Sequence, residues 1–447
     1  MSNKIIRELE NKKVAILGFG KEGRSTYNYI RKYLPNKMIS ILDQNKNLIN
    51  DELIKNDTSK ELILGEDYLD NLKVYDIIIK SPGIKINNIE EIKNKITSQI
   101  EIILELYRKN IIGITGTKGK STTSTLLYKV LKNQDIDCML LGNVGNPVLD
   151  SIDDIKKDTK LIIEMSSYQL ELVKHSPHIS VILNLFEDHL NYHITKEKYH
   201  LSKLNIFKFQ TEDDFALYTS TSPNIEHYIN EHNYKSHLIN IKKEFSTIGT
   251  DIYFNNKKVY DTSSKRILLG EHNLSNILFV IRISLLLNLD LNKTVETINN
   301  FKPLEHRMEI VGTFNNIKYY NDTIATIPEA TINCLKAYKD VDTIIFGGQD
   351  RGINYNGLIE YFNNSQIENF ICMPETGHKL STLIKKGNVY LVNTLEEAVD
   401  LAKKVTKTAC LLSPAAPSYN QFKNFEEKGK KYKELVSNNI GNNEKAN

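Results

Sequence analysis

The chain has 447 residues, of which 40% are hydrophobic and 25% are charged, values that are ordinary for a globular protein. At about 150 residues per domain, this length predicts roughly three domains. The formal net charge is only +3, and no dense block of Lys and Arg alternates with aromatic residues. We therefore expect no nucleic-acid partner.

Neither end nor middle of the sequence predicts a membrane segment. Residues 1–13 are polar and charged, unlike a signal peptide, and the apolar stretch 279–289 is too short for a span and contains Arg282. Four cysteines lack metal or redox spacing, which is typical of reduced core residues in a cytoplasmic protein. They are Cys138, Cys334, Cys372 and Cys410. We expect a cytoplasmic monomer without a membrane partner.

Residues 1–108 alternate short apolar strands with helical stretches. One strand leads into Gly18-Phe19-Gly20-Lys21-Glu22-Gly23, and the next ends in Asp43. This G-x-G-x-x-G pattern with a later acid is typical of a Rossmann-like dinucleotide-binding domain, but its glycine turn accepts any pyrophosphate. NAD and other nucleotides both remain open from these residues. The predicted elements are strands over 14–17, 38–42 and 75–79 and a helix over 24–33.

Residues 109–304 contain a phosphate loop. An apolar strand beginning at Ile111 runs into Gly116-Thr117-Lys118-Gly119-Lys120-Ser121, and a helix is predicted over 123–132. Glycines let backbone N–H groups turn toward phosphate oxygens, the lysine before the serine spans the outer phosphates, and the serine hydroxyl holds Mg²⁺. A glycine turn that binds nothing is the alternative. The flanking strand and helix favour a P-loop domain that binds ATP.

Two further strands of this segment end in polar residues. The strand over 161–163 ends in Glu164, and the strand over 180–183 is followed by Glu187-Asp188-His189. Ligands of parallel sheets lie beyond the carboxyl ends of the strands, so Lys120, Glu164 and His189 are expected at one edge. Glu164 is suited to Mg²⁺, which prefers oxygen ligands. The alternative is that both later residues are surface groups at strand exits.

Residues 305–447 alternate again, with strands over 317–320, 343–346 and 409–412 and a helix over 395–405. Each strand exit carries polar or glycine residues, as a small-molecule site requires. The fold class predicted for the whole chain is α/β with three domains. These are a Rossmann-like N-terminal domain, a central P-loop ATPase domain with a mostly parallel sheet, and a Rossmann-like C-terminal domain.

Several motifs together resemble the Mur ligases, which are ATP-dependent amide-forming enzymes that build the stem peptide of peptidoglycan. They are the Thr-Gly-Thr-x-Gly-Lys-Ser-Thr loop, a Glu-x-Ser-Ser-x-Gln-Leu segment, the Glu-Asp-His triplet and His306-Arg307. The closing stretch from Leu412 to Phe425 resembles the members that add D-glutamate. The resemblance implies UDP-N-acetylmuramoyl-L-alanine in place of NAD in the first domain, D-glutamate in the third, and an acyl phosphate intermediate.

The resemblance also implies roles for individual residues. The residues with catalytic roles would be Lys120, Glu164, His189 and Lys203. The ligands of two Mg²⁺ sites would be Ser121, Glu164, His189 and Lys203 as a carbamate. ATP contacts fall on Gly116, Thr117, Lys118, Gly119, Lys120, Ser121, Thr122, Asn276, Arg307 and Asp322. UDP-substrate contacts fall on Gly20, Lys21, Glu22, Asp43, Ser81, Gly83, Asn143 and His189. D-glutamate contacts fall on Thr326, Arg351, Ser418 and Phe425.

Two positions depart from the family pattern. Ile324 and Arg351 stand where some members have lysine, and only the arginine can still pair with a carboxylate. Another Mur ligase or a folylpolyglutamate synthase-like ligase is the nearest alternative, although the Asp-Asn-Pro-Arg signature of the third-residue ligase is absent. An NAD-dependent dehydrogenase is a distant alternative, because such an enzyme would have no use for the phosphate loop at 116–121.

Overall fold

The computed structural model has an α/β architecture and divides into two compact units. The residues that it describes are 2–86, 89–143 and 146–438. The first unit comprises Met1–Ser264 and Ser275–Ile298, and the second comprises Lys265–Leu274 and Asn299–Asn447. The mostly parallel sheets of both units confirm the predicted fold class. The predicted domain boundaries at 108/109 and 304/305 stay predictions.

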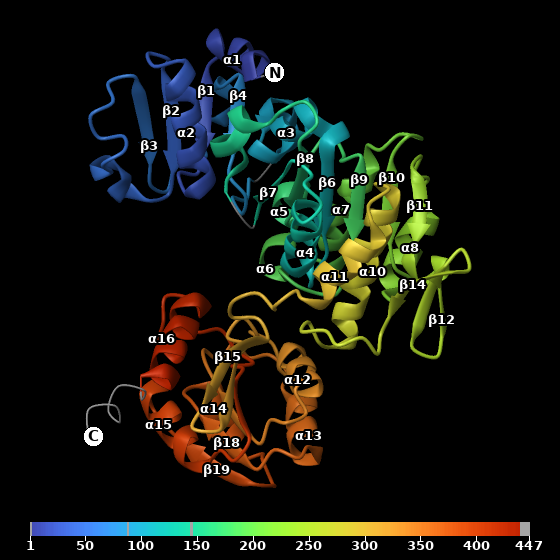
Figure 1. The fold of residues 1–447 in the computed structure, drawn as a ribbon. Helices are drawn as coiled ribbons and strands as arrows, with labels where there is room; N and C mark the ends of the chain where they lie inside the picture. The colour runs from blue at the N-terminus through green and yellow to red at the C-terminus, as the bar shows by residue number, and fades with distance from the viewer. Residues whose placement is uncertain (1, 87–88, 144–145, 439–447) are drawn as a thin grey trace, which may run out of the picture. The chain divides into compact units, whose positions relative to one another are not determined.

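The first sheet is a parallel Rossmann-like sheet in the order β3-β2-β1-β4-β5 (Figure 1). Its strands are β1 (Val14–Leu17), β2 (Ile39–Asp43), β3 (Lys60–Leu64), β4 (Ile77–Lys80) and β5 (Ile96–Thr97). Its helices are α1 (Ser2–Glu10), α2 (Lys21–Tyr33) and α3 (Gln99–Tyr107). The glycine turn between β1 and α2 therefore lies at the centre of the carboxyl edge.

The second sheet of the first unit is also parallel, in the order β11-β10-β9-β6-β8-β7. Its strands are β6 (Ile111–Thr115), β7 (Cys138–Gly142), β8 (Lys160–Glu164), β9 (Ile179–Ile182), β10 (Phe215–Tyr218) and β11 (His237–Asn240). The helices between them are α4 (Lys120–Lys132), α5 (Ser167–Leu170), α6 (Leu190–His193), α7 (Lys196–Lys208), α8 (Pro223–Glu231) and α9 (Ile241–Glu244). Because β9, β6 and β8 are neighbours, the predicted residues that follow them share one edge.

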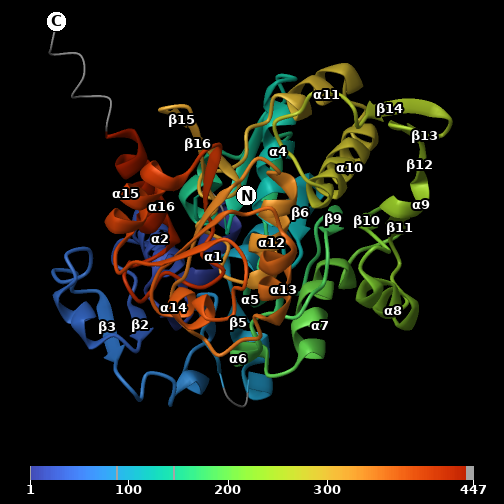
Figure 2. The ribbon, with the colours of Figure 1, turned by 90° about the horizontal axis from the view of Figure 1, so that it is seen from below.

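A small antiparallel sheet and two helices follow. The sheet contains β12 (Phe245–Ile248), β13 (Asp251–Phe254) and β14 (Lys257–Asp261), and the helices are α10 (Glu271–Leu286) and α11 (Leu291–Asn299). Figures 1 and 2 both show α10 and α11 beside α4. Side chains at the end of α4 bond to α11, with Asn133 Nδ2 donating to Thr297 Oγ1 at 3.1 Å. At the other end of α4, its N-cap Gly119 lies against Asn276 of α10.

The sheet of the second unit has the order β15-β16-β20-β17-β18-β19, and only β15 is antiparallel. Its strands are β15 (Glu309–Phe314), β16 (Ile317–Asn321), β17 (Thr343–Phe346), β18 (Asn369–Cys372), β19 (Asn388–Leu391) and β20 (Ala409–Leu412). Its helices are α12 (Pro328–Ala337), α13 (Asn356–Asn364), α14 (Thr376–Ser381), α15 (Leu395–Val405) and α16 (Phe425–Ser437). Figure 1 shows α15 and α16 on one face and α12 and α13 on the other.

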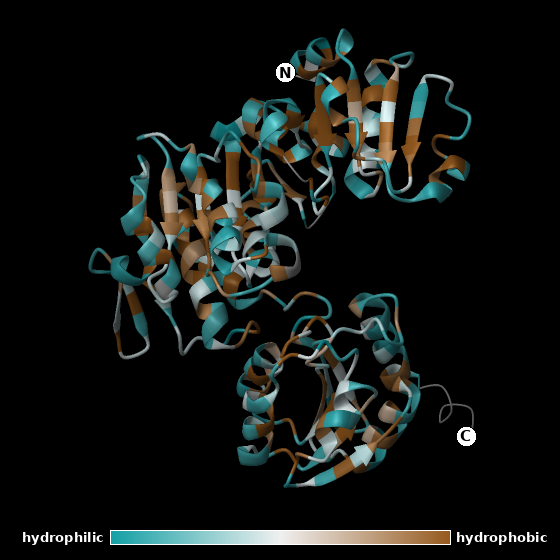
Figure 3. Ribbon diagram, turned by 180° about the vertical axis from the view of Figure 1, so that it is seen from behind, coloured by the Kyte–Doolittle hydropathy of each residue, from teal (hydrophilic) through white to brown (hydrophobic). Residues whose placement is uncertain are grey.

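Apolar strands form the cores, and Figure 3 shows them as mainly hydrophobic arrows within the units. In the second unit, Ile344 and Ile345 belong to different core clusters because successive side chains of a strand point to opposite faces. Both faces are covered by helices, which explains the continuous apolar runs in the sequence. None of the described helices combines the length and hydropathy needed to cross a bilayer.

Candidate active site

The predicted phosphate loop connects β6 to the first turn of α4. Gly116 and Gly119 adopt positive φ values of 150° and 88°, conformations that L side chains rarely adopt. A Cβ atom on Gly119 would lie 2.7 Å from Oδ1 of Asn276, a residue of α10. Glycine therefore allows close approach between the loop and Asn276, which was also predicted to contact ATP.

Asn184, which follows β9, holds the loop from the side. Its Oδ1 accepts a hydrogen bond from Lys118 N at 2.9 Å, and its Nδ2 donates to Lys118 O at 3.0 Å. The Asn184 carbonyl also accepts from Thr117 N at 3.0 Å. The sequence analysis assigned Asn184 no role, although a polar residue directly after a buried strand was the available signal. The loop is thus fixed before any phosphate binds.

The Lys120 ammonium folds back onto the loop. Its Nζ donates to the carbonyls of Gly116 and Thr117 at 2.9 and 3.1 Å. Ser121, the next residue, is half-buried in the first turn of α4. The helix N-terminus and the lysine charge together form an environment that suits an anion.

Glu164 ends β8 and is 1% exposed. Its Oε1 accepts a hydrogen bond from Asn143 Nδ2 at 2.7 Å, whereas its buried Oε2 has no hydrogen-bond partner among the described residues. An unpartnered buried carboxylate oxygen costs free energy unless a ligand satisfies it. The oxygen fits a hard cation such as Mg²⁺.

Lys203 lies on α7 and is only 2% exposed. Its Nζ donates to Gly116 O at 3.0 Å, the same carbonyl that Lys120 contacts, and lies 4.9 Å from the Tyr199 ring centroid. Burial, followed by repulsion from Lys120, holds the pKa of Lys203 well below its usual value. The structure therefore brings this residue to the loop, although only the family resemblance indicated a role for it.

His189 precedes α6 and adopts a φ of 54°. Burial lowers the pKa of its imidazole, and the nearby Lys203 and Lys120 ammonium groups lower it further, against the opposing effect of Asp188. Among the described residues, no group of three or more His, Cys, Asp and Glu side chains is placed to hold a metal. The predicted metal set contains only Glu164 and His189 of these types, so it depends on Ser121 and Lys203 as well.

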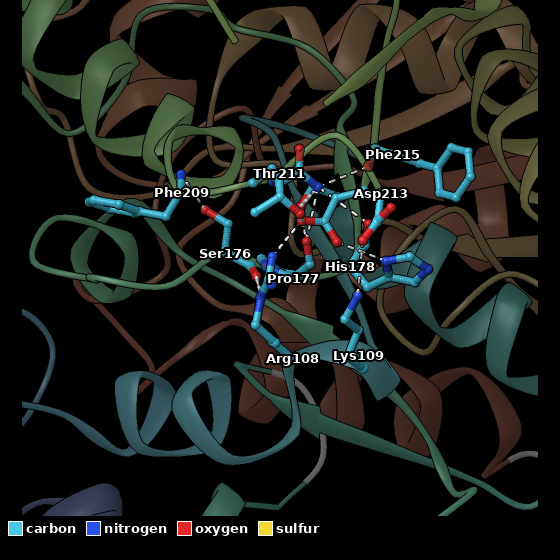
Figure 4. A network of polar contacts seen from close by, with 12 residues as sticks. Arg108, Lys109, Ser176, Pro177, His178, Phe209, Thr211, Asp213 and Phe215 are labelled. Atoms are coloured by element: carbon cyan, nitrogen blue, oxygen red, sulfur yellow. Dashed lines mark hydrogen bonds and ion pairs between the residues drawn. The ribbon is translucent and has the colours of Figure 1, made fainter. Parts of the chain in front are cut away.

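A different polar network occupies the opposite edge of the central sheet (Figure 4). The fully buried Asp214 carboxylate accepts hydrogen bonds from Arg108, from His178 Nδ1 at 2.8 Å and from Thr211 N at 2.7 Å. Burial opposes ionisation, but the bonds from His178 and Thr211 leave the pKa of Asp214 below its usual value. These residues precede β6, β9 and β10, so they lie away from the carboxyl edge where ligands bind. We therefore assign the network a structural role.

The predicted UDP pocket follows β1, β2 and β4. Gly18 has a φ of 88°, its carbonyl accepts from Ser81 Oγ at 2.9 Å, and Phe19 N donates to Asp43 Oδ2 at 2.7 Å. Asp43 Oδ1 accepts from a second backbone N–H, so this carboxylate also shapes the turn. Added Cβ atoms at Gly20 and Gly83 meet open space.

Glu22, predicted near the substrate, points toward the central sheet. Its Oε1 accepts from Gln169 Nε2 on α5 at 2.8 Å, while its buried Oε2 has no hydrogen-bond partner among the described residues. Burial raises the pKa of Glu22. Lys21, the preceding residue, is exposed. Gln169 therefore connects the two sheets of this unit, a role that the sequence analysis did not assign.

In the second unit, Asp322 follows β16 and is buried. Its Oδ1 accepts from Met308 N at 3.0 Å, and its Oδ2 accepts from Ser413 Oγ at 3.1 Å. Burial raises the pKa of Asp322 to about 6, and the charge of nearby Arg307 acts in the opposite direction. The predicted nucleotide residues Arg307 and Asp322 thus lie near one another.

The predicted D-glutamate residues occupy the exits of β16, β17 and β20. Thr326 is half-buried, and the exposed Arg351 guanidinium lies 6.0 Å from the Tyr419 ring centroid. Ser418 is 3% exposed, and its Oγ has no hydrogen-bond partner among the described residues. Phe425 is the first residue of α16. These exits share the carboxyl edge, as expected for a small-molecule site.

Comparisons with known proteins agree across the whole chain. Three family descriptions match, namely "Mur ligase MurD-like, N-terminal domain" over 12–104, "Mur ligase middle domain" over 114–284 and "Mur ligase, glutamate ligase domain" over 306–415. UDP-N-acetylmuramoylalanine–D-glutamate ligase from Oenococcus oeni is 31% identical, with 97% of this chain and 98% of the relative covered. The ligase of the same name from Clostridioides difficile is 33% identical, with 96% and 99% covered.

Solved structures show the same fold at lower identity. MurF ligase from Thermotoga maritima in complex with ADP has a TM-score of 0.59 and 17% identity, with 97% of each chain covered. UDP-N-acetylmuramate-alanine ligase MurC from Thermotoga maritima has a TM-score of 0.55 and 17% identity, with 94% of this chain and 98% of that chain covered.

Proposed function

The chain belongs to the Mur ligase family, and from this membership we propose that it joins D-glutamate to UDP-N-acetylmuramoyl-L-alanine in an ATP-dependent step of peptidoglycan synthesis. Near-full-length relatives that carry this reaction in their names support the proposal. The observation that carries it is the meeting of the glycine loop and buried Lys203 at one sheet edge, beside the unpartnered oxygen of Glu164. We further propose that the enzyme acts as a cytoplasmic monomer.

The glycine loop would bind the phosphates of ATP. Lys120 would exchange its bonds to loop carbonyls for bonds to phosphate oxygens, and Asn276 would contact the nucleotide beside Gly119. Thr117, Lys118 and Thr122 stay predicted contacts of the same loop. Arg307 and Asp322 stay predicted nucleotide contacts in the second unit.

Magnesium would be held by Ser121, Glu164, His189 and a carbamate on Lys203, in two sites. The unpartnered Oε2 of Glu164 supports this assignment. When bound, Mg²⁺ would reduce the electrostatic repulsion between the phosphates and the attacking carboxylate, which are both negatively charged.

Carbamylation would turn the buried amine of Lys203 into an oxygen ligand. Burial supports this chemistry, because CO₂ reacts with a neutral amine and burial disfavours the charged form. Intact mass measured under native conditions in bicarbonate should include the mass of one CO₂, which Lys203→Ala should lack. Lys198→Ala, on the exposed face of the same helix, is the matched control. A bare amine together with undiminished activity of Lys203→Ala would overturn the assignment.

The two other substrates would bind in the flanking segments. Asn143 and His189 would face the sugar and alanyl part of the UDP substrate, and the remaining UDP contacts would come from Gly20, Lys21, Glu22, Asp43, Ser81 and Gly83. D-glutamate would contact Thr326, Arg351, Ser418 and Phe425. Ser418 is well suited to this role, because its buried hydroxyl lacks a hydrogen-bond partner in the described chain.

The reaction would proceed in two steps. The terminal carboxylate of the UDP-linked L-alanine attacks the γ-phosphorus of ATP, ADP leaves, and an acyl phosphate forms. The amine of D-glutamate then attacks the activated carbonyl carbon, and phosphate leaves as the amide forms. Lys120 would stabilise the charge that develops on the transferred phosphoryl group.

Phosphate release from ATP tests the proposal directly. We expect release to require both UDP-N-acetylmuramoyl-L-alanine and D-glutamate. Turnover without the UDP substrate, or equally with L-glutamate, would overturn the specific assignment. Turnover with a diamino acid or L-alanine would indicate another Mur ligase, whereas a pteroate substrate would indicate a folylpolyglutamate synthase.

A further inference from the structure

Lys428 on α16 is a buried lysine that forms no ion pair with any described residue. Its side chain is 2% exposed, and its Nζ donates to Gly347 O at 3.0 Å. Burial alone lowers the pKa of Lys428 to about 7, since no charged group of the described chain acts on it. The Phe422 ring centroid, 6.0 Å away, is a further neighbour of the ammonium. A buried cation with so little compensation is costly and unusual.

A second buried lysine and a partly buried one do interact with acids. Buried Lys80 is influenced by Glu22 and Glu171, and Lys433 on the same helix pairs with Glu305 and Glu309. Lys428 also lies in the first turn of α16, where the partial positive charge of a helix N-terminus offers a cation no stabilisation. Its position is therefore not explained by the electrostatics of the protein alone.

Lys428 lies where the predicted D-glutamate loops meet. Gly347 directly follows β17 and begins the loop that carries Arg351. Within this loop, Gln349 N donates to Pro417 O at 2.8 Å, and Pro417 precedes Ser418. The ammonium of Lys428 thus binds the start of one substrate loop, which in turn bonds to the other. An ammonium has three N–H donors, and Gly347 uses one.

The proposed amino-acid substrate needs more positive charge than its predicted contacts provide. D-glutamate carries two carboxylates, but Arg351 is the single cation among Thr326, Arg351, Ser418 and Phe425. Ile324, at a position where some family members have lysine, adds none. Hydroxyl and backbone donors bind a carboxylate but do not neutralise its charge. A hydrogen bond from a charged donor is about twice as strong as one from a neutral donor.

We propose that Lys428 supplies the second positive charge of the D-glutamate site and donates to the carboxylate that Arg351 does not hold. It would thereby select a dicarboxylic amino acid over a neutral one. This inference rests on the proposed function. It explains why the chain retains a buried ammonium at Gly347, the first residue of the loop that bonds to Pro417.

Steady-state kinetics of the full-length enzyme test the inference, with phosphate release measured against each substrate. Lys428→Met should raise the KM for D-glutamate by about 30-fold or more, as expected for loss of a buried charged contact. The KM values for ATP and the UDP substrate should change less than about twofold, because Lys428 is proposed to contact D-glutamate only. A similar rise in all three KM values would instead indicate general damage to the enzyme. Lys428→Arg keeps the charge and should retain most of the affinity. Lys430→Met removes an exposed lysine of the same helix and is the control.

A second measurement compares D-glutamate with D-glutamine, which has one carboxylate. The wild-type enzyme should prefer D-glutamate strongly, and Lys428→Met should lose most of that preference. An unchanged preference, or equal rises in all three KM values, would overturn the inference. If Lys428→Met does not fold, Lys428→Gln replaces it, and an unchanged KM for D-glutamate in that variant has the same meaning. Absence of D-glutamate-dependent turnover in the wild-type enzyme would instead refute the proposed function.

Discussion

Two glycine loops of this protein, 116–119 after β6 and 347–352 after β17, differ in the charges around them. Two ammonium groups, from Lys120 and Lys203, contact the first loop, and the acids Glu164 and Asp188 act on Lys203. In the second loop, the carboxylate of Asp350 pairs with Lys379 at 2.6 Å, whereas no charged group of the described chain acts on Lys428, which binds the loop at Gly347.

The difference indicates different ligands. Cations and acids together suit an anion that arrives with a metal ion, since the acids coordinate the metal while the lysines bind phosphate. A cation on which no acid acts, such as Lys428, suits a carboxylate that arrives without a metal ion. The surroundings of Lys203 thus support the proposed magnesium nucleotide, and those of Lys428 support the proposed acidic amino acid.

The largest expected effect concerns the cation of the first loop. Lys120→Met should lower turnover by about 10³-fold, because the lysine charge acts on the transferred phosphoryl group. Phosphate release under saturating substrates measures this loss. Lys129→Met, on the exposed surface of the same helix, serves as the control. Turnover within tenfold of wild type would show that this loop does not act on phosphate.

The next prediction concerns the acid that distinguishes the first loop. Glu164→Gln should lower turnover by about 10²-fold and raise the Mg²⁺ concentration needed for half-maximal rate, since an amide oxygen binds a hard cation less strongly. A titration of rate against Mg²⁺ separates the two effects. Glu197→Gln changes an exposed acid on α7 and should leave the titration unchanged. An unchanged Mg²⁺ requirement in Glu164→Gln would argue against the metal assignment.

The same comparison shows what the sequence could predict. Strand bounds at Val14–Leu17, Thr343–Phe346 and Ala409–Leu412 agree with the prediction, because apolar runs between polar residues define buried parallel strands. The helices predicted from 24 and 123 begin instead at Lys21 and Lys120, directly after a glycine N-cap. Glycine adopts the extended or left-handed conformation of an N-cap at little cost, so each helix starts at the end of its glycine turn.

The site residues also differ in whether the sequence could predict their positions. Glu164 was predictable because an acid at the end of an apolar strand has a definite position. Lys203 and Lys428 were not, since a single lysine in a helix is normally solvated and Lys428 also lies in a charged stretch. Their burial depends on packing against distant segments, such as α16 against β15 and β16. Only the family resemblance indicated Lys203, and nothing in the sequence analysis indicated Lys428.

A stability measurement sharpens the contrast between the loops. Lys428→Met should stabilise the enzyme without ligands by about 1–4 kcal/mol at pH 7, because it replaces an uncompensated buried charge with an apolar side chain. The folded-state pKa of about 7 lies below the usual lysine value, so the unfolded chain binds the additional proton between these two pH values. The cost to the wild-type protein is therefore complete below pH 7 and declines as the pH rises.

Melting temperatures at pH 7 and pH 9 check this prediction. The advantage of Lys428→Met should be larger at pH 7, and Lys430→Met should melt like the wild-type protein at both values. A variant that is less stable than wild type at pH 7 would mean that the Gly347 hydrogen bond outweighs the cost of burying the charge.

The smallest expected effect concerns backbone conformation at the end of α6, the helix that His189 precedes. The second loop places glycine at its positive φ values, at Gly347 and Gly352, whereas Ile194 at the end of α6 adopts a φ of 69°. A β-branched residue in this region is strained, and its side chain is 60% exposed, so little packing offsets the cost. Ile194→Gly should therefore stabilise the protein by about 1 kcal/mol.

Thermal unfolding measures the change. Ile248→Gly is the control, because Ile248 is also exposed but lies in a β-strand, where glycine lowers stability. Equal losses in both variants would show that Ile194 is unstrained, whereas a gain at Ile194 alone would show that the segment beside His189 stores strain that the second loop avoids.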